Sequence, residues 1–151
     1  MMDTENPITQ LSAEDALKFL SQRALGRLAI SINGRPDIFP INYAINARSN
    51  DDVVAYIRAS AGNKLFATAV GSPLALEADL VETETATSAI LYGTARQVQY
   101  PDELQLVDSL GLTAWIADPK PEVIAIDVER ISGRTFKLGP APDTPAMETP
   151  D

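Results

Sequence analysis

An Asn-Gly pair lies between two runs of alternating apolar residues, and it constrains the fold of this chain more than any other feature. Asn33 and Gly34 both tolerate positive φ angles, so they predict the two-residue type I′ turn of a β-hairpin. Before the pair, apolar residues recur at every second position from Leu28 to Ile32, which is the period of a strand. A return strand is expected over residues 36–46.

The expected return strand contains Pro40, which has no N–H to donate to a sheet. Apolar residues occupy both faces of the segment, so we expect burial on both sides. Two explanations of Pro40 remain open at this point. The strand either has a β-bulge there, or it forms a sheet edge along which a ligand lies.

Four further strands and three helices follow from the same patterns. Strands are expected over residues 53–57, 74–81, 88–98 and 123–136, with a bend or bulge at Gly93. Helices are expected from the capping residue Ser12 to Gly26, over 65–70, and from Pro101 to Gly111. Six strands in mostly sequential antiparallel pairing predict a mainly β fold that closes into a small barrel, with short peripheral helices.

Composition sets the outer limits of the domain and excludes several classes of function. Residues 1–10 are expected to be flexible, residues 11–138 to form one domain, and the Pro-rich tail 139–151 to be disordered. The chain has 12 Lys and Arg against 21 Asp and Glu, and a net charge of −9 argues against nucleic-acid or anionic membrane partners. Without a membrane-length apolar run or a signal-peptide pattern, a cytoplasmic location is expected.

The absence of Cys and His excludes several kinds of site. Thiolate and imidazole zinc sites, Cys nucleophiles and Ser-His-Asp triads all require one of these residues. The acidic residues lack the spacing of a known cation-binding loop, so no metal site is expected. If the chain is an enzyme, a bound organic cofactor carries the chemistry.

Residues 56–65 combine the end of a strand, a short turn and the start of a helix. Arg58 and Lys64 supply two cations there, and Ser60 and Asn63 supply neutral hydrogen-bonding groups. Backbone N–H groups at a helix start also favour an anion. The segment is therefore either a phosphate-binding turn or an ordinary strand-to-helix connection with surface cations.

Three motifs in order, GRLAISINGRPDIFPINYAI, YIRASAGNKL and ISGRTF, carry a family resemblance. Together they resemble the pyridoxamine 5'-phosphate oxidase-like family of flavin-binding split barrels, over residues 11–138. The resemblance is strongest to a small bacterial branch that includes nitroimidazole-resistance-type reductases. It implies a six-stranded antiparallel split barrel and a homodimer that binds FMN between its subunits.

The resemblance also implies a set of cofactor-binding residues. The return strand would run along the flavin ring, the end of the next strand would continue the contact, and the turn would hold the phosphate. Asn63 departs from the family, where this position is commonly basic. Trp115 would approach from the other subunit, and a core or interface role is equally open. The implied residues are Phe39, Pro40, Ile41, Asn42, Tyr43, Ile57, Arg58, Ala59, Ser60, Asn63, Lys64, Leu65 and Trp115.

The implied activity is an FMN-dependent oxidoreductase that moves a hydride or electrons between a reduced nicotinamide and a small organic acceptor. The C-terminal substrate signature of true pyridoxamine phosphate oxidases is absent, so that substrate is not expected. No catalytic residue is identified: Tyr43 is a candidate acid, but a buried Tyr bonded to the backbone explains it as well. Two alternatives stay open, a deazaflavin-dependent reductase of the same fold and a non-enzymatic flavin-binding protein.

Overall fold

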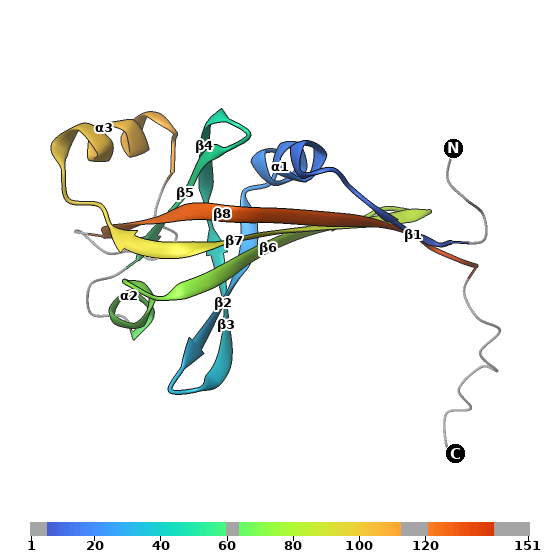
Figure 1. The fold of residues 1–151 in the computed structure, drawn as a ribbon, viewed down its shortest axis with the longest axis horizontal. Helices are drawn as coiled ribbons and strands as arrows, with labels where there is room; N and C mark the ends of the chain where they lie inside the picture. Colours follow the sequence, from blue (N-terminus) through green and yellow to red (C-terminus); the bar gives the residue numbers. More distant parts are fainter. Residues whose placement is uncertain (1–5, 60–63, 113–120, 141–151) are drawn as a thin grey trace, which may run out of the picture.

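The computed structural model describes residues 6–59, 64–112 and 121–140, with eight strands and three helices among them (Figure 1). The helices are α1 (Ala13–Ser21), α2 (Lys64–Ala69) and α3 (Pro101–Ser109). The strands are β1 (Ile8–Gln10), β2 (Leu25–Ile32), β3 (Arg35–Asn42), β4 (Ala44–Ser49), β5 (Asp52–Ala59), β6 (Pro73–Val81), β7 (Thr85–Gln97) and β8 (Glu122–Lys137). None of the helices in these ranges is long and apolar enough to span a membrane.

The strands form one antiparallel sheet in the order β3-β2-β6-β7-β8-β5-β4, and β1 pairs with β8 outside this path. This confirms the predicted mainly β, antiparallel split-barrel class. The number of strands differs from the prediction for two reasons. The expected return strand divides at Tyr43 into β3, which pairs with β2, and β4, which pairs with β5. In addition, residues 8–10 pair with β8, although the sequence analysis placed them in a flexible terminus.

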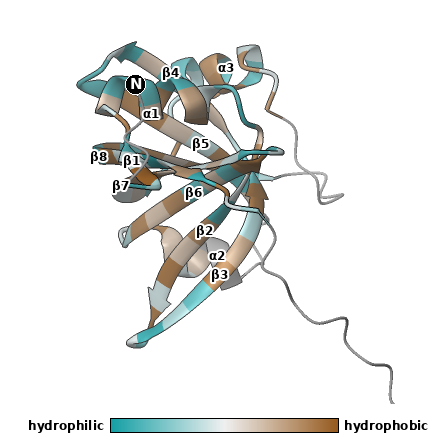
Figure 2. Ribbon diagram, turned by 90° about the vertical axis from the view of Figure 1, so that its right-hand side faces the viewer, coloured by the Kyte–Doolittle hydropathy of each residue, from teal (hydrophilic) through white to brown (hydrophobic). Residues whose placement is uncertain are grey.

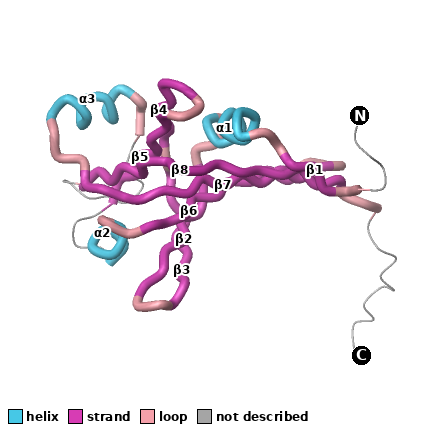
Figure 3. The backbone as a smooth tube through the Cα atoms, viewed as in Figure 1, coloured by secondary structure: helices cyan, strands magenta, loops and turns pink. Residues whose placement is uncertain are grey.

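The sheet curls so that strands far apart in its order share one core. Ile41 of β3 and Tyr43 lie in the same buried cluster as Ile57 and Ala59 of β5. Brown and paler or teal segments follow one another along β2 in Figure 2, and buried and exposed residues alternate there, as expected for a strand with one face on the core. The three helices lie outside the strands in the tube view (Figure 3). The fold is therefore a split barrel, and the expected closure of the sheet is wrong: among the described strands, β3 and β4 end the main path and β1 is a further edge strand.

The β2–β3 hairpin forms as predicted. Asn33 and Gly34 have φ angles of 51° and 77°, as a type I′ turn requires. The pairing runs from Leu25–Asn42 to Ile32–Arg35 without a register shift, so the bulge explanation of Pro40 is wrong. The expected burial on both faces is also wrong, because Ile38 is 63% exposed. β3 is an edge strand, and Pro40 is exposed on it.

Gly26 does not end the first helix, contrary to the prediction. Helix α1 ends at Ser21, and Gly26 lies inside β2. A Cβ atom at Gly26 would lie 2.7 Å from the carbonyl oxygen of Glu77 and 3.2 Å from a ring atom of Tyr43. The glycine is thus required by close packing between strands, not by a helix end.

Other local predictions are confirmed. The hydroxyl of Ser12 accepts a hydrogen bond from the N–H of Asp15 at 3.1 Å and caps α1. Helix α3 packs through Leu104, Val107 and Leu110 onto a second apolar cluster. The pairing of β7 with β8 shifts register at Tyr92–Gly93, so the chain has the expected bulge there.

Candidate functional site

The predicted cofactor-binding residues that the structure describes lie on β3, β5, the short link between β3 and β4, and the start of α2. Four of them are buried in the core: Ile41, Tyr43, Ile57 and Ala59 are each at most 8% exposed. Phe39 packs against the same core, whereas Pro40 is exposed and Asn42 is half-buried. These positions remain predictions of a cofactor site.

Several predicted residues cannot be placed in the same detail. Ser60, Asn63 and Trp115 lie outside the described residues. Lys64 and Leu65 form the start of α2, which follows the end of β5 after four residues. The strand and the helix that the sequence predicted on either side of this segment are thus present, and the phosphate-binding role stays a prediction.

Arg58 of β5 points to helix α3. Its Nε donates to the carbonyl of Leu112 at 2.7 Å, and its Nη2 donates to Asp108 at 2.8 Å. The Arg58 side chain is only 15% exposed. The sequence analysis predicted a cofactor contact for Arg58. In the structure its side chain bonds to residues at the C-terminal end of α3.

Tyr43 is bonded to the backbone. Its hydroxyl donates to the carbonyl of Leu20, at the end of α1, over 2.6 Å, and the residue is 4% exposed. Burial, the largest cause, raises the pKa of Tyr43 well above its usual value. The geometry matches the hypothesis that Tyr43 is a buried tyrosine bonded to the backbone, not the hypothesis that it is a catalytic acid.

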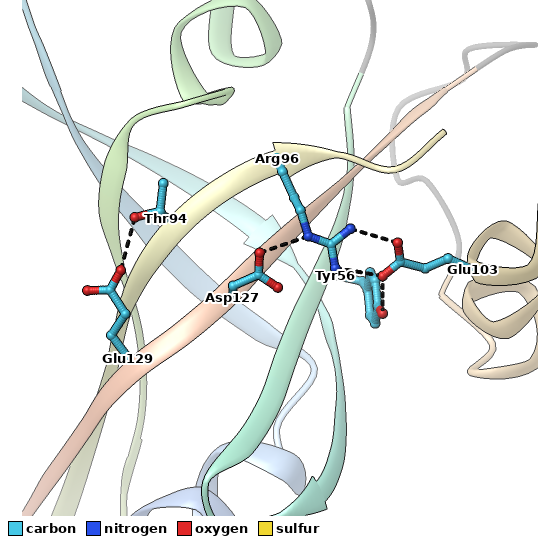
Figure 4. A network of polar contacts seen from close by, with 6 residues as sticks. All are labelled: Tyr56, Thr94, Arg96, Glu103, Asp127 and Glu129. Atoms are coloured by element: carbon cyan, nitrogen blue, oxygen red, sulfur yellow. Dashed lines mark hydrogen bonds and ion pairs between the residues drawn. The ribbon is translucent and has the colours of Figure 1, made fainter. Parts of the chain in front are cut away.

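A network of charged side chains, which the sequence analysis missed, joins α3 to the sheet (Figure 4). Arg96 of β7 donates to both carboxylate oxygens of Glu103, at 2.7 and 2.8 Å, and its Nε donates to Asp127 of β8 at 2.8 Å. The hydroxyl of the buried Tyr56 donates to Glu103 at 2.8 Å. The bonds from Arg96 are the largest cause of a lowered pKa at Glu103.

A second polar cluster lies on β2, β6 and β7. Arg27 Nη1 donates to Glu77 at 2.8 Å and to Asp79 at 2.9 Å, and Ser88 donates to Glu77 at 3.1 Å. Burial, followed by the neighbouring Asp79, raises the pKa of Glu77. These residues meet because they occupy cross-strand positions on one face of the sheet. Their spacing in the sequence does not indicate that they are neighbours.

Three surface cavities lie away from the predicted cofactor-binding residues. They measure about 660, 570 and 410 Å³ and open at the β2–β3 turn, beside the Arg96 network and at the junction of α1 with β2. The predicted residues line none of these three. Among the described residues no group of acidic side chains has the geometry of a metal site.

The sequence of residues 12–135 matches the family model described as pyridoxamine 5'-phosphate oxidase. The match spans most of the 151 residues. The chain belongs to the pyridoxamine 5'-phosphate oxidase family. No curated protein matches the sequence.

Solved structures from this family resemble the chain over nearly its whole length. A protein from Corynebacterium glutamicum, provisionally described as a pyridoxamine 5'-phosphate oxidase, is 34% identical, with a TM-score of 0.78 over 93% of this chain and 99% of that one. A FAD-binding protein from Mycobacterium smegmatis is 30% identical, with a TM-score of 0.77 over 87% and 100%. A FAD-binding protein from Mesorhizobium loti, at 20% identity and a TM-score of 0.69 over 87% and 98%, supports the fold alone.

Proposed function

We propose that this member of the pyridoxamine 5'-phosphate oxidase family binds a flavin nucleotide. The observation that carries the proposal is the similarity to a protein described as FAD-binding, which is 30% identical and is covered over its whole length. The sequence resemblance favours FMN, and this relative makes FAD the second candidate. Deazaflavin is the third, and it is less favoured because the chain is strongly acidic.

The described residues fit such a ligand at two places. The exposed Pro40 lies on an open sheet edge, where backbone groups face outward. Four residues separate Ala59, at the end of β5, from Lys64, at the first position of α2. We propose that residues 39–43, at the end of β3 and in its link to β4, position the ring and that Lys64, with Ser60 and Asn63, holds the phosphate.

A bound flavin supplies hydride or electron transfer, here between a reduced nicotinamide and a small organic acceptor. The protein then contributes position, hydrogen bonds and the exclusion of water. We propose that the functional unit is a homodimer, as the family resemblance implies, with the flavin between the subunits. The alternative is a non-enzymatic flavin carrier, because no catalytic acid has been identified in this chain.

The absorption spectrum of the purified protein tests the flavin proposal directly. We expect flavin bands, and chromatography of the released chromophore identifies FMN, FAD or deazaflavin. Lys64→Ala should weaken retention by about tenfold or more, whereas the matched control Lys18→Ala, on the exposed side of α1, should not. A colourless protein that takes up none of the three molecules would refute flavin binding.

Turnover separates the enzyme from the carrier. Oxidation of a reduced nicotinamide by the flavin-loaded protein, faster than by free flavin, supports a reductase. A loaded protein that does not accelerate this oxidation is a carrier. Sedimentation of the loaded protein tests the homodimer, and a monomer that binds flavin with full affinity would contradict it.

A further inference from the structure

The open edge of β3 has an unusual set of backbone groups. Strand β3 pairs only with β2, so one of its sides has no strand partner among the described residues. An edge strand normally presents alternating N–H and C=O groups, which another strand can pair with. Which groups β3 presents follows from the register of the hairpin.

The hairpin register determines which β3 residues face the free side. A two-residue turn makes Ile32 and Arg35 the hydrogen-bonded pair that closes it. Hydrogen-bonded and non-hydrogen-bonded pairs then alternate along an antiparallel ladder. Positions 37, 39 and 41 therefore bond to β2, and positions 36, 38, 40 and 42 direct their backbone groups outward.

An independent bond confirms this alternation. The N–H of Tyr43 donates to the carbonyl of Ala24 at 3.0 Å, which continues the inward series at odd positions. Both prolines of the strand, Pro36 and Pro40, occupy outward positions, where the ladder to β2 does not need their missing N–H groups.

The outward positions from residue 36 to residue 40 lack free donors. Pro36 and Pro40 have no N–H. The only N–H between them, that of Ile38, donates to the carboxylate of its neighbour Asp37 at 2.9 Å. From residue 36 to residue 40 the edge thus presents carbonyl oxygens alone, although Ile38 is 63% exposed and apolar.

We propose that Pro36, Asp37 and Pro40 make residues 36–40 of the β3 edge unable to accept another β-strand, including β3 of a second copy of this chain. Two paired strands each donate N–H groups and accept through C=O groups. Residues 36–40 of this edge can only accept. The inference depends on the backbone register, the two prolines and the bond between Ile38 and Asp37, and it does not require the proposed flavin.

The test restores the donors. In Pro36→Ala/Asp37→Ala/Pro40→Ala, positions 36 and 40 gain an N–H and Ile38 loses its acceptor. Pro101→Ala is the matched control, because Pro101 is an exposed proline at the start of α3, away from any strand edge. Sedimentation velocity measures self-association, and circular dichroism checks that each variant is folded.

We expect the triple variant to self-associate with a constant about tenfold or more above those of wild type and Pro101→Ala. An unchanged constant would overturn the proposal. The single variant Pro40→Ala gives a second readout if the triple variant does not fold. The amide introduced at position 40 should exchange rapidly with solvent while those of Phe39 and Ile41 stay protected, and slow exchange at position 40 would show that the edge is not open.

Discussion

Arg96 and Glu103 form a two-pronged ion pair that fixes the first turn of α3 to β7, with N–O distances of 2.7 and 2.8 Å. The two residues are only seven positions apart, but the chain leaves the sheet and turns into a helix between them. Tyr56 reaches the same carboxylate from β5. One carboxylate thus connects three elements, and this makes α3 an integral part of the fold.

Glu103→Gln should lower the free energy of unfolding by about 1–3 kcal/mol, because Arg96 and Tyr56 lose a charged acceptor. The lower half of this range is expected, since the Arg96 side chain is 41% exposed and solvent screens the pair. Urea unfolding at neutral pH measures the change. Asp127→Asn is the control: its carboxylate is 53% exposed, and a loss below about 1 kcal/mol is expected.

The same carboxylate should make stability depend on acid pH. Its folded pKa is lowered below the usual 4.5, chiefly by Arg96, so its contribution is complete above that value and is lost as pH falls through the lowered pKa. Glu103→Gln should therefore flatten the acid limb of the stability curve in a urea series. Glu77, whose pKa is raised, acts in the opposite sense, because its ionisation above pH 4.5 disfavours the fold. A steeper acid limb in Glu103→Gln would contradict the assignment.

Tyr43→Phe should cost about 1 kcal/mol of stability and leave any flavin-dependent activity unchanged. The variant removes the 2.6 Å bond to Leu20, but the Leu20 carbonyl still accepts from the N–H of Arg23 at 3.1 Å. Urea unfolding and the rate of nicotinamide oxidation measure the two effects. Loss of activity at unchanged flavin content would instead identify Tyr43 as an acid.

Arg58→Met should lower the free energy of unfolding by about 1–3 kcal/mol and loosen the end of α3, because a nearly buried guanidinium loses two acceptors. Hydrogen exchange of the α3 amides and urea unfolding measure these effects. Asp108→Asn is the matched variant: it keeps Arg58, and its side chain is 73% exposed, so a loss below about 1 kcal/mol is expected.

The same pair of variants tests the predicted cofactor contact of Arg58. If Arg58 meets the ligand, flavin affinity falls by about tenfold or more in Arg58→Met and is unchanged in Asp108→Asn. Equal affinity in both variants and wild type would restrict Arg58 to its role in holding α3.

Gly93→Ala should destabilise the protein by about 3 kcal/mol or more, or prevent folding, because backbone must move to make room. A Cβ atom at Gly93 would overlap the carbonyl oxygen of Asp127 and lie 2.9 Å from the side chain of Ile126. Thermal unfolding measures the loss. Gly139→Ala, where a Cβ atom meets nothing within 4 Å, should leave stability unchanged, and equal effects in the two variants would refute the packing argument.

Features that depend on neighbouring residues could be predicted from the sequence. The Asn33–Gly34 turn needs only two residues that tolerate positive φ, and the Ser12 cap needs only an acceptor three residues before an N–H. Strand periodicity and the order of the motifs then indicated the fold class and the family. The sequence by itself therefore determined that this chain is an antiparallel β protein with its first hairpin at residue 33.

Only the tertiary structure decided which strand edge stays open, that Gly26 serves strand packing, and where Arg58 and Arg96 direct their charges. Glu77, Asp108, Leu112 and Asp127 are the partners in these contacts, and most lie dozens of positions away in the chain. Local spacing carries no record of such partners, because a curled sheet brings residues together through strand order and register.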